Sequence, residues 1–390
     1  MEEQEYIVFE VVSTGPGEED FSFGAAEDAE EPPTAVMDVQ TLSPEDAEDA
    51  RRAPGVVVAE PLPTQLIQPV EESDVAQPLD AGPTWGIHAV GAAESSFTGK
   101  GIKVAVLDTG IDASHPAFAA LTVTEEDFTG EGDGDTNGHG THCAGTIAGR
   151  DVDGIRFGVA QGIDELLVGK VLGRHGGSTA AIMSAMVWAL ENGANVLSMS
   201  LGIDFPGLVD RLTAQGLKVQ PATSRALEAY RDNLKLFGSV ASLIAASNAF
   251  GRAAVVVAAT GNESERDASP PYTIGVAPPA ASDGFIRVGA LGEDGAGGFG
   301  IASFSNTGAT LAAPGVGVVS AKTGGGLTSK SGTSMATPHV AGVAALWAEK
   351  LAGDERLDPD ILLGELRGKS RELAPLTARD VGSGLVRAPS

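Results

Sequence analysis

The sequence predicts an α/β protein with a doubly wound, mostly parallel sheet flanked by helices, preceded by a small α+β N-terminal region. Two observations indicate this fold. Apolar runs of strand length alternate with amphipathic helical stretches, a pattern that favours parallel strands joined by helices. Polar side chains suited to catalysis follow these runs, where the carboxyl ends of parallel strands form a ligand cleft. The runs lie at residues 104–108, 166–172, 196–202 and 255–259.

The chain is expected to divide into a small and a large unit. Its 390 residues are 42% hydrophobic, enough for one large domain and a smaller one. We expect an acidic region and linker at residues 1–80 and the large α/β domain at residues 81–390. An insertion at about 203–250 has the pattern of two helices, over 205–216 and 223–249. It is either a decorated surface, or a wall over the substrate cleft or a partner surface.

Negative charge is concentrated near the N-terminus. The formal net charge is −28, and residues 1–80 carry 21 acidic side chains against two basic ones. This balance argues against nucleic acid or an anionic membrane as a partner, and no apolar run is long enough to span a bilayer. The single cysteine, Cys143, allows no internal disulfide. The acidic start of the chain lacks a basic, apolar signal segment, so we expect a cytoplasmic protein, with secretion left open.

The first 80 residues show a strand–helix–strand pattern. Residues 6–12 and 56–59 have the apolar composition of strands. Between them, Ser43 followed by proline and acids predicts the N-cap and first turn of a short helix. Residues 13–33 predict a loop or disorder, and residues 69–82 predict a linker. The simpler alternative for the whole region is an acidic, partly disordered tail.

Four polar side chains have the types and positions that acyl transfer requires. Asp108 ends a buried strand, His139 opens a glycine-flanked helix, and Asn262 follows another strand. Ser334 follows a glycine turn at a helix start, where free N–H groups favour an oxyanion. A serine nucleophile, a histidine base, an orienting acid and an amide donor together perform this reaction. Pro338 is expected in the first turn of the serine helix, where its missing N–H is not needed.

The motifs around these residues resemble those of the subtilisin-like serine proteases (subtilases), of intracellular type with a short propeptide-like N-terminal region. The order aspartate, histidine, serine is that of subtilisin and differs from the order in other triad enzymes. The resemblance covers roughly Pro83 to the C-terminus. It rests on D-T-G at 108–110, H-G-T-H-C-A-G at 139–145, A-T-G-N at 259–262 and G-T-S-M-A-T-P-H at 332–339.

This resemblance implies a serine endopeptidase that works through an acyl-enzyme. The implied roles are acid for Asp108, base for His139, nucleophile for Ser334 and side-chain oxyanion donor for Asn262. Two strands would form the walls of the primary specificity pocket, one by pairing with the substrate backbone. These walls are Ser200, Leu201 and Gly202 on one side and Ala259, Thr260 and Gly261 on the other. Asp135 and Asn137 would border the pocket for the residue before the scissile one.

By the same resemblance, residues 1 to about 75 are an inhibitory propeptide, and the protein is a zymogen. Residues 62–68 are extended and apolar, so they suit an added strand beside Ser200, Leu201 and Gly202 in the cleft. Self-cleavage is expected between Gln68 and Asp80. The expected partners are therefore a peptide or protein substrate and the chain's own N-terminal region.

The implied chemistry requires no cofactor, and no metal ligand is assigned. Subtilisins carry a tight calcium site in a loop that corresponds to Asp151 and Asp153. That site also needs an acid where this chain has Ala117, and Ca²⁺ binds weakly to few carboxylate oxygens. A structural calcium ion therefore has little support from the sequence.

Two other functional interpretations stay open. The chain could be a latent or catalytically inactive subtilisin fold that acts as a binding module, although all four chemical residues are present. The same residues could also serve an esterase or a ligase. A comparison of amide with ester substrates would separate these activities.

Overall fold

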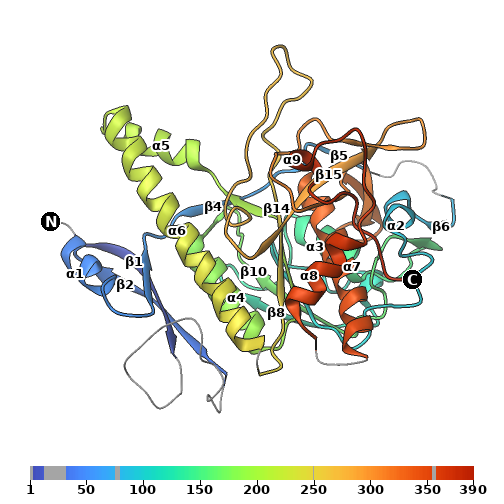
Figure 1. The fold of residues 1–390 in the computed structure, drawn as a ribbon, viewed down its shortest axis with the longest axis horizontal. Helices are drawn as coiled ribbons and strands as arrows, with labels where there is room; N and C mark the ends of the chain where they lie inside the picture. Colours follow the sequence, from blue (N-terminus) through green and yellow to red (C-terminus); the bar gives the residue numbers. More distant parts are fainter. Residues whose placement is uncertain (1–2, 13–31, 75–79, 249, 354–356) are drawn as a thin grey trace.

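The protein is organised around one large sheet (Figure 1) in the computed structural model, which describes residues 3–12, 32–74, 80–248, 250–353 and 357–390. Its strand order is β16-β15-β14-β12-β7-β10-β8, with β17 paired to β15. Every pairing is parallel except that of β15 with β16. The predicted doubly wound, mostly parallel sheet is therefore confirmed. The strands are β7 (Val104–Asp108), β8 (Thr122–Asp127), β10 (Glu165–Lys170), β12 (Val196–Met199), β14 (Val255–Ala259), β15 (Phe285–Glu293), β16 (Phe299–Ile301) and β17 (Leu311–Pro314).

Helices cover both faces of this sheet because alternate strand residues point to opposite sides. In β7, Val104 and Val106 pack in one core cluster, whereas Ala105 and Leu107 pack in the other. The first cluster includes residues of α3 and α7, and the second includes residues of α4 and α6. These helices are α3 (His139–Ala148), α4 (Thr179–Glu191), α6 (Val219–Asn248) and α7 (Thr333–Ala352).

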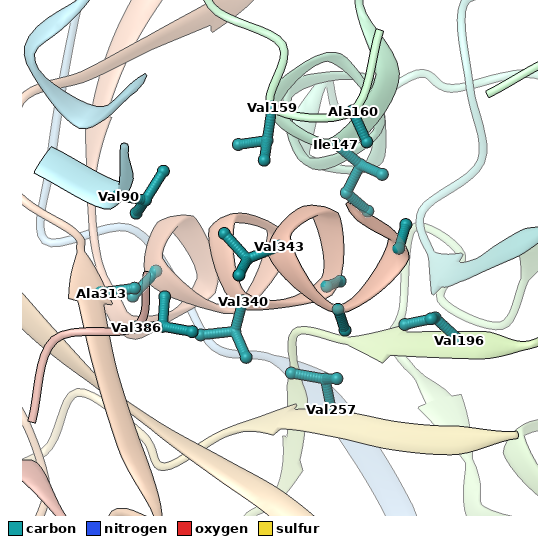
Figure 2. Packing of buried hydrophobic residues seen from close by; sticks show 14 of the residues in the cluster. Val90, Ile147, Val159, Ala160, Val196, Val257, Ala313, Val340, Val343 and Val386 are labelled. Atoms are coloured by element: carbon teal, nitrogen blue, oxygen red, sulfur yellow. The ribbon is translucent and has the colours of Figure 1, made fainter. Parts of the chain in front are cut away.

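Helix α7 is enclosed on all sides. Every residue from Thr333 to Ala348 is buried, as expected for a helix that is apolar around its whole circumference. Figure 2 shows Val340 and Val343 of α7 surrounded by apolar side chains of other elements. Full burial of one such side chain stabilises a fold by about 1.5–3 kcal/mol. The start of α7, which carries Ser334, is therefore firmly placed.

The N-terminal residues form a small unit with its own sheet, in the order β2-β1-β3, and one helix. Its elements are β1 (Gln4–Val12), β2 (Thr34–Leu42), α1 (Pro44–Ala50) and β3 (Val56–Ala59). Ser43 caps α1 as predicted, because its Oγ accepts a 3.1 Å hydrogen bond from the backbone N–H of Asp46. The strand–helix–strand pattern is confirmed, and the loop predicted at 13–33 lies almost wholly outside the described residues.

Two strands differ from the sequence-based expectation. Strand β2, which the pattern does not predict, pairs with β1 along nine residues. The linker predicted at 69–82 is wrong in part, since β5 (Glu71–Asp74) pairs antiparallel with β19 (Leu327–Ser331). Both β2 and β5 lie at sheet edges with most side chains exposed. Neither strand therefore shows the apolar alternation that marks a half-buried strand in a sequence.

The insertion forms the two predicted helices, α5 (Phe205–Ala214) and α6. Helix α6 runs beside the N-terminal unit (Figure 1). The buried side chain of Asn233 donates from Nδ2 to the carbonyl of Glu60 at 2.9 Å, and Arg225 pairs with the Glu60 carboxylate at 3.4 Å. The insertion is therefore a surface against which the N-terminal unit rests.

Shorter elements complete the described fold. They are β4 (Pro63–Leu66), β6 (Gly82–Pro83), β9 (Ile155–Arg156), β11 (Gly177–Ser178), β13 (Leu201–Ile203), β18 (Val318–Ala321), α2 (Trp85–Val90), α8 (Pro359–Gly368), α9 (Ala378–Val381) and the 3₁₀ helix Pro116–Phe118. Within the described ranges, no helix combines the length and apolar character needed to cross a membrane.

Candidate active site

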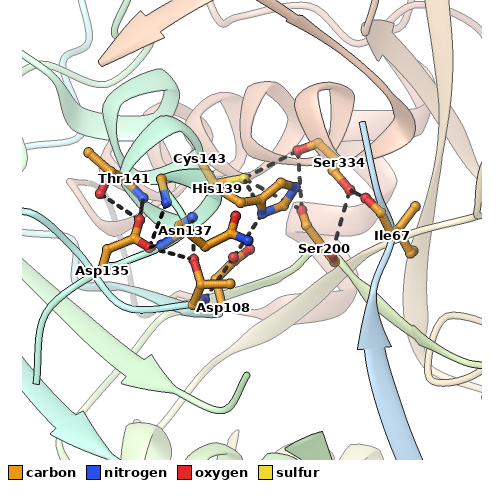
Figure 3. Close-up of polar contacts among 12 residues, drawn as sticks. Ile67, Asp108, Asp135, Asn137, His139, Thr141, Cys143, Ser200 and Ser334 are labelled. Carbon is orange, nitrogen blue, oxygen red and sulfur yellow. Dashed lines mark hydrogen bonds and ion pairs between the residues drawn. The ribbon is translucent and has the colours of Figure 1, made fainter. Parts of the chain in front are cut away.

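Asp108 is the last residue of β7, at the carboxyl edge of the sheet, and its side chain is buried. Its Oδ1 accepts a 2.8 Å hydrogen bond from the backbone N–H of Thr109 and another of 2.8 Å from Nδ1 of His139 (Figure 3). An ionised carboxylate only accepts hydrogen bonds, so Nδ1 of His139 carries a proton. The pair therefore fixes both the orientation and the tautomer of the imidazole.

Glycines allow His139, the first residue of α3, to lie against Asp108. Gly138 before it has a φ of 92°, which residues with a side chain rarely adopt. A Cβ atom on Gly140 would lie 2.2 Å from the carbonyl oxygen of Gly110. At Gly140, helix α3 and the turn after β7 thus approach too closely for a residue with a side chain. Gly140 therefore has a packing role, whereas Gly138 provides the positive φ that starts the helix.

The protonation of His139 is governed by its carboxylate neighbour. Burial lowers the pKa of His139, but the charge and hydrogen bond of Asp108, with a smaller contribution from Cys143, raise it well above its usual value. Nε2 of His139 has no hydrogen-bond partner among the described residues. The imidazole can therefore take up a proton at Nε2 while Nδ1 stays bonded to Asp108.

Asp135 braces the same corner with a buried carboxylate that accepts five hydrogen bonds. The donors are Thr109 Oγ1 (2.9 Å), the N–H groups of Asn137 (2.9 Å), Gly138 (2.8 Å) and Thr141 (2.9 Å), and Thr141 Oγ1 (2.7 Å). These bonds tie the turn after β7 to the start of α3, so Asp135 positions His139 relative to Asp108. Sequence reasoning missed this role. The place of Asp135 and of the exposed Asn137 beside a substrate pocket stays a prediction.

Ser334 is the second residue of α7, after the Gly332–Thr333 turn. Pro338 is the sixth residue of this helix, so the expectation that it lies in the first turn is wrong. Its missing N–H leaves the Ser334 carbonyl without the usual helical hydrogen bond. That carbonyl instead accepts from Ser200 Oγ at 3.2 Å and lies 3.5 Å from Cys143 Sγ. The proline thus lets α3 and the segment between β12 and β13 hold the start of α7.

Asn262 follows β14 and directs its amide nitrogen into the cleft. Its Oδ1 accepts hydrogen bonds of 2.8 Å from both the N–H and the Oγ1 of Thr333. These two donors identify the oxygen, so the other atom of the amide is Nδ2. Nδ2 donates to the carbonyl of Gln68 at 2.9 Å. Sequence reasoning missed the orienting role of Thr333, because Thr333 and Asn262 are 71 positions apart in the chain.

The cleft is filled by residues 62–68. The added strand predicted beside Ser200, Leu201 and Gly202 is present and pairs with Leu201, Gly202 and Ile203. Strand β4 pairs antiparallel with β13 on one side and with β11 on the other. The apolar side chains of Leu62, Leu66 and Ile67 are buried. The facing pairs are Leu201 with Leu66, Gly202 with Gln65 and Ile203 with Thr64.

The same segment continues past Ser334 without a break. Ser334 Oγ donates to the carbonyl of Ile67 at 3.1 Å (Figure 3). The carbonyl that Asn262 holds belongs to the next residue, Gln68. Beyond these contacts, β5 pairs with β19. Residues 62–74, here called the cleft segment, therefore lie on both sides of Ser334.

The residues expected to line the primary pocket have distinct surroundings. Leu201 and Gly202 pair with the cleft segment, as described for β13. Thr260 is buried, and its Oγ1 donates to the Val288 carbonyl at 3.1 Å, so its side chain bonds within the sheet. Ala259 is buried at the end of β14, and the N–H of Gly261 donates to Thr333 Oγ1 at 3.3 Å. Their role as pocket walls stays a prediction.

The loop at Asp151 does not present the oxygen ligands of a tight calcium site. Oδ1 of Asp151 accepts a 2.8 Å hydrogen bond from Gln161 Nε2, and the buried Ala117 has no side-chain oxygen. In the described ranges, one group of three potential metal-ligating side chains lies close together, and it is Asp108, His139 and Cys143. The residues of the loop therefore do not fit the calcium site that the family implies.

Fold and site together define a serine hydrolase of the α/β class. A buried aspartate–histidine pair lies at the carboxyl edge of a parallel sheet, and a serine starts a neighbouring helix. A side-chain amide faces the same cleft. The chain belongs to the subtilase family, because the model of the Subtilase family (Peptidase S8) matches residues 99–362.

Sequence relatives agree with this assignment. The M-protease of Shouchella clausii (strain KSM-K16) is 37% identical over 325 residues, which cover 81% of this chain and 69% of that protein. Subtilisin DY of Bacillus licheniformis is 38% identical over 261 residues, 65% of this chain and 79% of that protein. An intracellular serine protease of Paenibacillus polymyxa is 37% identical over 256 residues, 64% and 67% of the two chains. The chain is therefore a subtilisin-like serine endopeptidase.

Proposed function

We propose that this chain hydrolyses peptide bonds through Asp108, His139 and Ser334, with an acyl-enzyme intermediate. The observation that carries the proposal is the buried 2.8 Å hydrogen bond between Asp108 Oδ1 and His139 Nδ1. This bond holds the imidazole in the tautomer whose Nε2 accepts a proton. The Cys143 thiol lies 3.8 Å from His139 Nδ1 and 3.5 Å from the Ser334 carbonyl oxygen. The base and the serine therefore both contact Cys143. These contacts support a nucleophile placed beside its base.

Acylation then follows from the chemistry of these groups. His139 Nε2 takes the hydroxyl proton of Ser334 as Oγ attacks the substrate carbonyl carbon. The negative charge of Asp108 stabilises the imidazolium that forms. The imidazolium gives its proton to the leaving amine as the carbon–nitrogen bond breaks, and the acyl group stays on Ser334. His139 then takes a proton from water as the water attacks the ester, and this step releases the acid product and restores the serine.

Asn262 is the proposed side-chain donor to the oxyanion. Its Nδ2 points into the cleft because Thr333 holds its Oδ1 with two hydrogen bonds of 2.8 Å. The backbone N–H of Ser334, in the first turn of α7, is the proposed second donor. Donors fixed before the reaction stabilise developing charge without reorganisation, and one such donor is worth about 2.7–4 kcal/mol in the transition state.

We further propose that the N-terminal region holds this enzyme latent, as its own inhibitor. The cleft segment pairs with β13 as a substrate strand would, but its carbonyls are not placed for attack. Ser334 Oγ donates to the carbonyl of Ile67, whereas Asn262 donates to that of Gln68. Attack requires one carbonyl to meet both groups. The contacts therefore support a segment that occupies the cleft without being cleaved in this arrangement.

Full-length variants test both proposals. Leu66→Asp places a charge at a buried position of the cleft segment, so it should open the cleft and raise hydrolysis of a chromogenic peptide at least about tenfold. Adding Ser334→Ala should abolish that activity. Leu227→Asp, at an exposed leucine of α6, is the matched control. No rise with Leu66→Asp would contradict latency, and turnover by the Ser334→Ala chain would contradict the nucleophile.

Self-cleavage between Gln68 and Asp80 is a separate part of the proposal. Intact-mass spectrometry of wild type and Ser334→Ala after expression should show a shortened chain for wild type alone. A wild-type chain that stays full-length would show that the inhibitor is not removed by the enzyme itself.

Hydrolysis of an ester but not an amide would favour the esterase alternative. A cytoplasmic location stays a prediction.

A further inference from the structure

Beyond Ser334, the cleft segment is held by a strand that buries almost nothing. The N–H of Val70 donates to the Ser331 carbonyl at 2.8 Å, and β5 then runs along β19 with Glu72 directly opposite Lys330. All four side chains of β5 are exposed. Apolar burial therefore does not account for the pairing of β5 with β19. Backbone hydrogen bonds and ion pairs hold these strands together instead.

Two lysines face two acids of β5. Lys330 Nζ lies 3.1 Å from Glu72 Oε1, and Lys322 Nζ lies 2.5 Å from Asp74 Oδ1. The Lys330 side chain is 3% exposed, whereas that of Glu72 is 56% exposed. A lysine is rarely so buried without an anionic partner. In the described part of the chain, Glu72 is the carboxylate within 4 Å of Lys330.

We propose that β19, with Lys330 and Lys322, is a substrate-binding surface that selects acidic side chains well beyond the scissile bond. The inference rests on the protease function proposed above. Once the cleft segment is displaced, β19 becomes an edge strand whose N–H and C=O groups pair with an extended peptide. The preferred substrate is then a peptide or an unfolded protein segment with acids downstream of the cut.

The register of β5 specifies where those acids lie. Glu72 and Asp74 are the fifth and seventh residues after Ile67, whose carbonyl contacts Ser334. Two positions apart on a strand, they share one face. A substrate in the same register, cut after the residue that takes the place of Ile67, would present its fifth and seventh residues beyond the cut to Lys330 and Lys322. The net charge of −28 repels acidic peptides in general, so a preference for acids at these positions is a local effect of the two lysines.

Peptide binding to the full chain tests this surface without turnover. The chain carries Leu66→Asp to open the cleft and Ser334→Ala to prevent cleavage. One fluorescent peptide has the sequence of residues 62–74, and a second carries Glu72→Gln and Asp74→Asn. The acidic peptide should bind about tenfold more tightly, which corresponds to about 1.4 kcal/mol.

Lysine variants assign the preference to its source. In the chain with both Lys330→Gln and Lys322→Gln, the dissociation constants of the two peptides should lie within about twofold of each other. The energetic coupling between the lysines and the peptide acids would then be lost. Lys100→Gln, at an exposed lysine before the amino end of β7, should leave the tenfold preference intact. Equal affinities in the lysine-bearing chain, or a preference that survives the double lysine replacement, would overturn the proposal.

Turnover separates this inference from the protease function. The same two peptides, each carrying Pro69→Ala, are incubated with the Leu66→Asp chain, in which Ser334 is intact. The value of kcat/KM should be about tenfold higher for the acidic peptide. A binding preference with no cleavage of either peptide would contradict the protease function but not the binding surface. Cleavage of both at equal rates would contradict the surface alone.

A second measurement applies if thermal melting shows that the Leu66→Asp chain does not fold. In the chain with Ser334→Ala alone, Lys330→Gln should speed amide hydrogen exchange at residues 71–74 about tenfold, while Lys100→Gln should not. Unchanged exchange would show that the ion pairs do not hold β5, and the proposal would be wrong.

Discussion

Two histidines on helix α3 have the same burial and opposite pKa shifts. His139 and His142 are three positions apart, and neither side chain is exposed. Burial lowers the pKa of His139, but Asp108 outweighs burial and raises it above the usual value. The pKa of His142 is lowered well below its usual value, by burial first and then by the positive charge of Lys330.

The difference teaches that the hydrogen-bond partner decides what a buried histidine does. Nε2 of His142 donates to the Val318 carbonyl at 3.0 Å, and a neutral acceptor does not balance a buried positive charge. His339 is similar, with Nδ1 2.8 Å from the Met335 carbonyl and a pKa lowered by burial to about 4. Burial alone makes a histidine neutral and structural, whereas burial beside a carboxylate makes it able to carry a proton.

The largest effect expected from this contrast comes from removing the His139 imidazole. In the Leu66→Asp chain, His139→Ala should lower kcat by on the order of 10⁶, the loss that subtilisin shows when its serine or histidine is replaced. Without the imidazole, no group accepts the Ser334 proton. Steady-state hydrolysis of a peptide substrate measures the change, and a loss of less than about a hundredfold would contradict the base assignment.

Replacing the carboxylate should make His139 behave more like His142. Asp108→Asn should lower kcat about 10⁴-fold, as the equivalent change does in chymotrypsin-type enzymes. The base must be neutral to act, so a raised pKa puts the acidic limb of kcat/KM above pH 6.5. Removing the charge lowers the pKa, and the limb should move to lower pH. Asp283→Asn, at an exposed aspartate, is the control. A limb that stays in place would show that Asp108 does not set the pKa.

Replacing Asn262 tests whether stabilising the negative charge of the oxyanion matters as much as stabilising the positive charge of His139. Asn262→Ala should lower kcat about 10²–10³-fold with little change in KM, the range measured for this donor in subtilisin. The variant lacks the amide that would donate a hydrogen bond to the oxyanion, which forms only in the transition state. If KM alone rises, Asn262 binds the ground state of the substrate, and its assignment as an oxyanion donor is wrong.

His142 should affect stability and not catalysis. His142→Leu leaves the Val318 carbonyl without its donor, so the free energy of unfolding should fall by about 1–3 kcal/mol, with kcat within a few fold. Urea unfolding measures this, with His88→Ala at an exposed histidine as the control. A thousandfold loss of kcat without loss of stability would place His142 in the catalytic machinery.

The pH dependence of that loss has a definite sign. The folded pKa of His142 is depressed, so below pH 6.5 the unfolded chain binds a proton that the folded chain does not. The wild type is therefore penalised as the pH falls. The stability difference between wild type and His142→Leu should shrink below pH 6.5. A difference that grows at low pH would show that His142 is charged in the fold.

Calcium removal should have the smallest effect. Since the loop at Asp151 lacks the ligands of a tight site, chelation should shift the melting temperature of the described fold by less than about 2 °C. Melting curves with and without chelator measure it. A large drop would reveal a strong calcium site elsewhere in the chain.

Each of the four groups proposed for catalysis stands next to a local signal in the sequence. Asp108 ends an apolar strand, and Asn262 comes shortly after another. His139 follows Gly138, and Ser334 follows the Gly332–Thr333 turn, both at helix starts. Their supporting contacts have no such signal. Thr333 and Asn262, for example, are 71 positions apart. Such pairs meet only through the packing of the sheet, so no local pattern marks them.

Edge strands and helix ends were the parts of the fold least accessible to pattern reasoning. Strand β5 shows no apolar alternation because its exposed side chains bury nothing, and the sequence alone suggested a linker. The position of Pro338 depends on where α7 begins, and helix ends shift by a residue or two. The effect of Pro338 on the Ser334 carbonyl became visible only from the contacts that this carbonyl makes with Ser200 and Cys143 in the structure.

The cleft segment is anchored at both ends. On one side it continues from β3, in the unit that rests on α6, and on the other the chain enters the main domain at β6 and α2. An intact segment therefore opens only as a loop and closes again on the same molecule, so dilution would not relieve the inhibition proposed above. A single cut between the cleft segment and β6 would convert the loop into a dissociable strand, and the proposed inhibition would then fall with dilution. One broken bond would thus change the order of the inhibition from unimolecular to bimolecular.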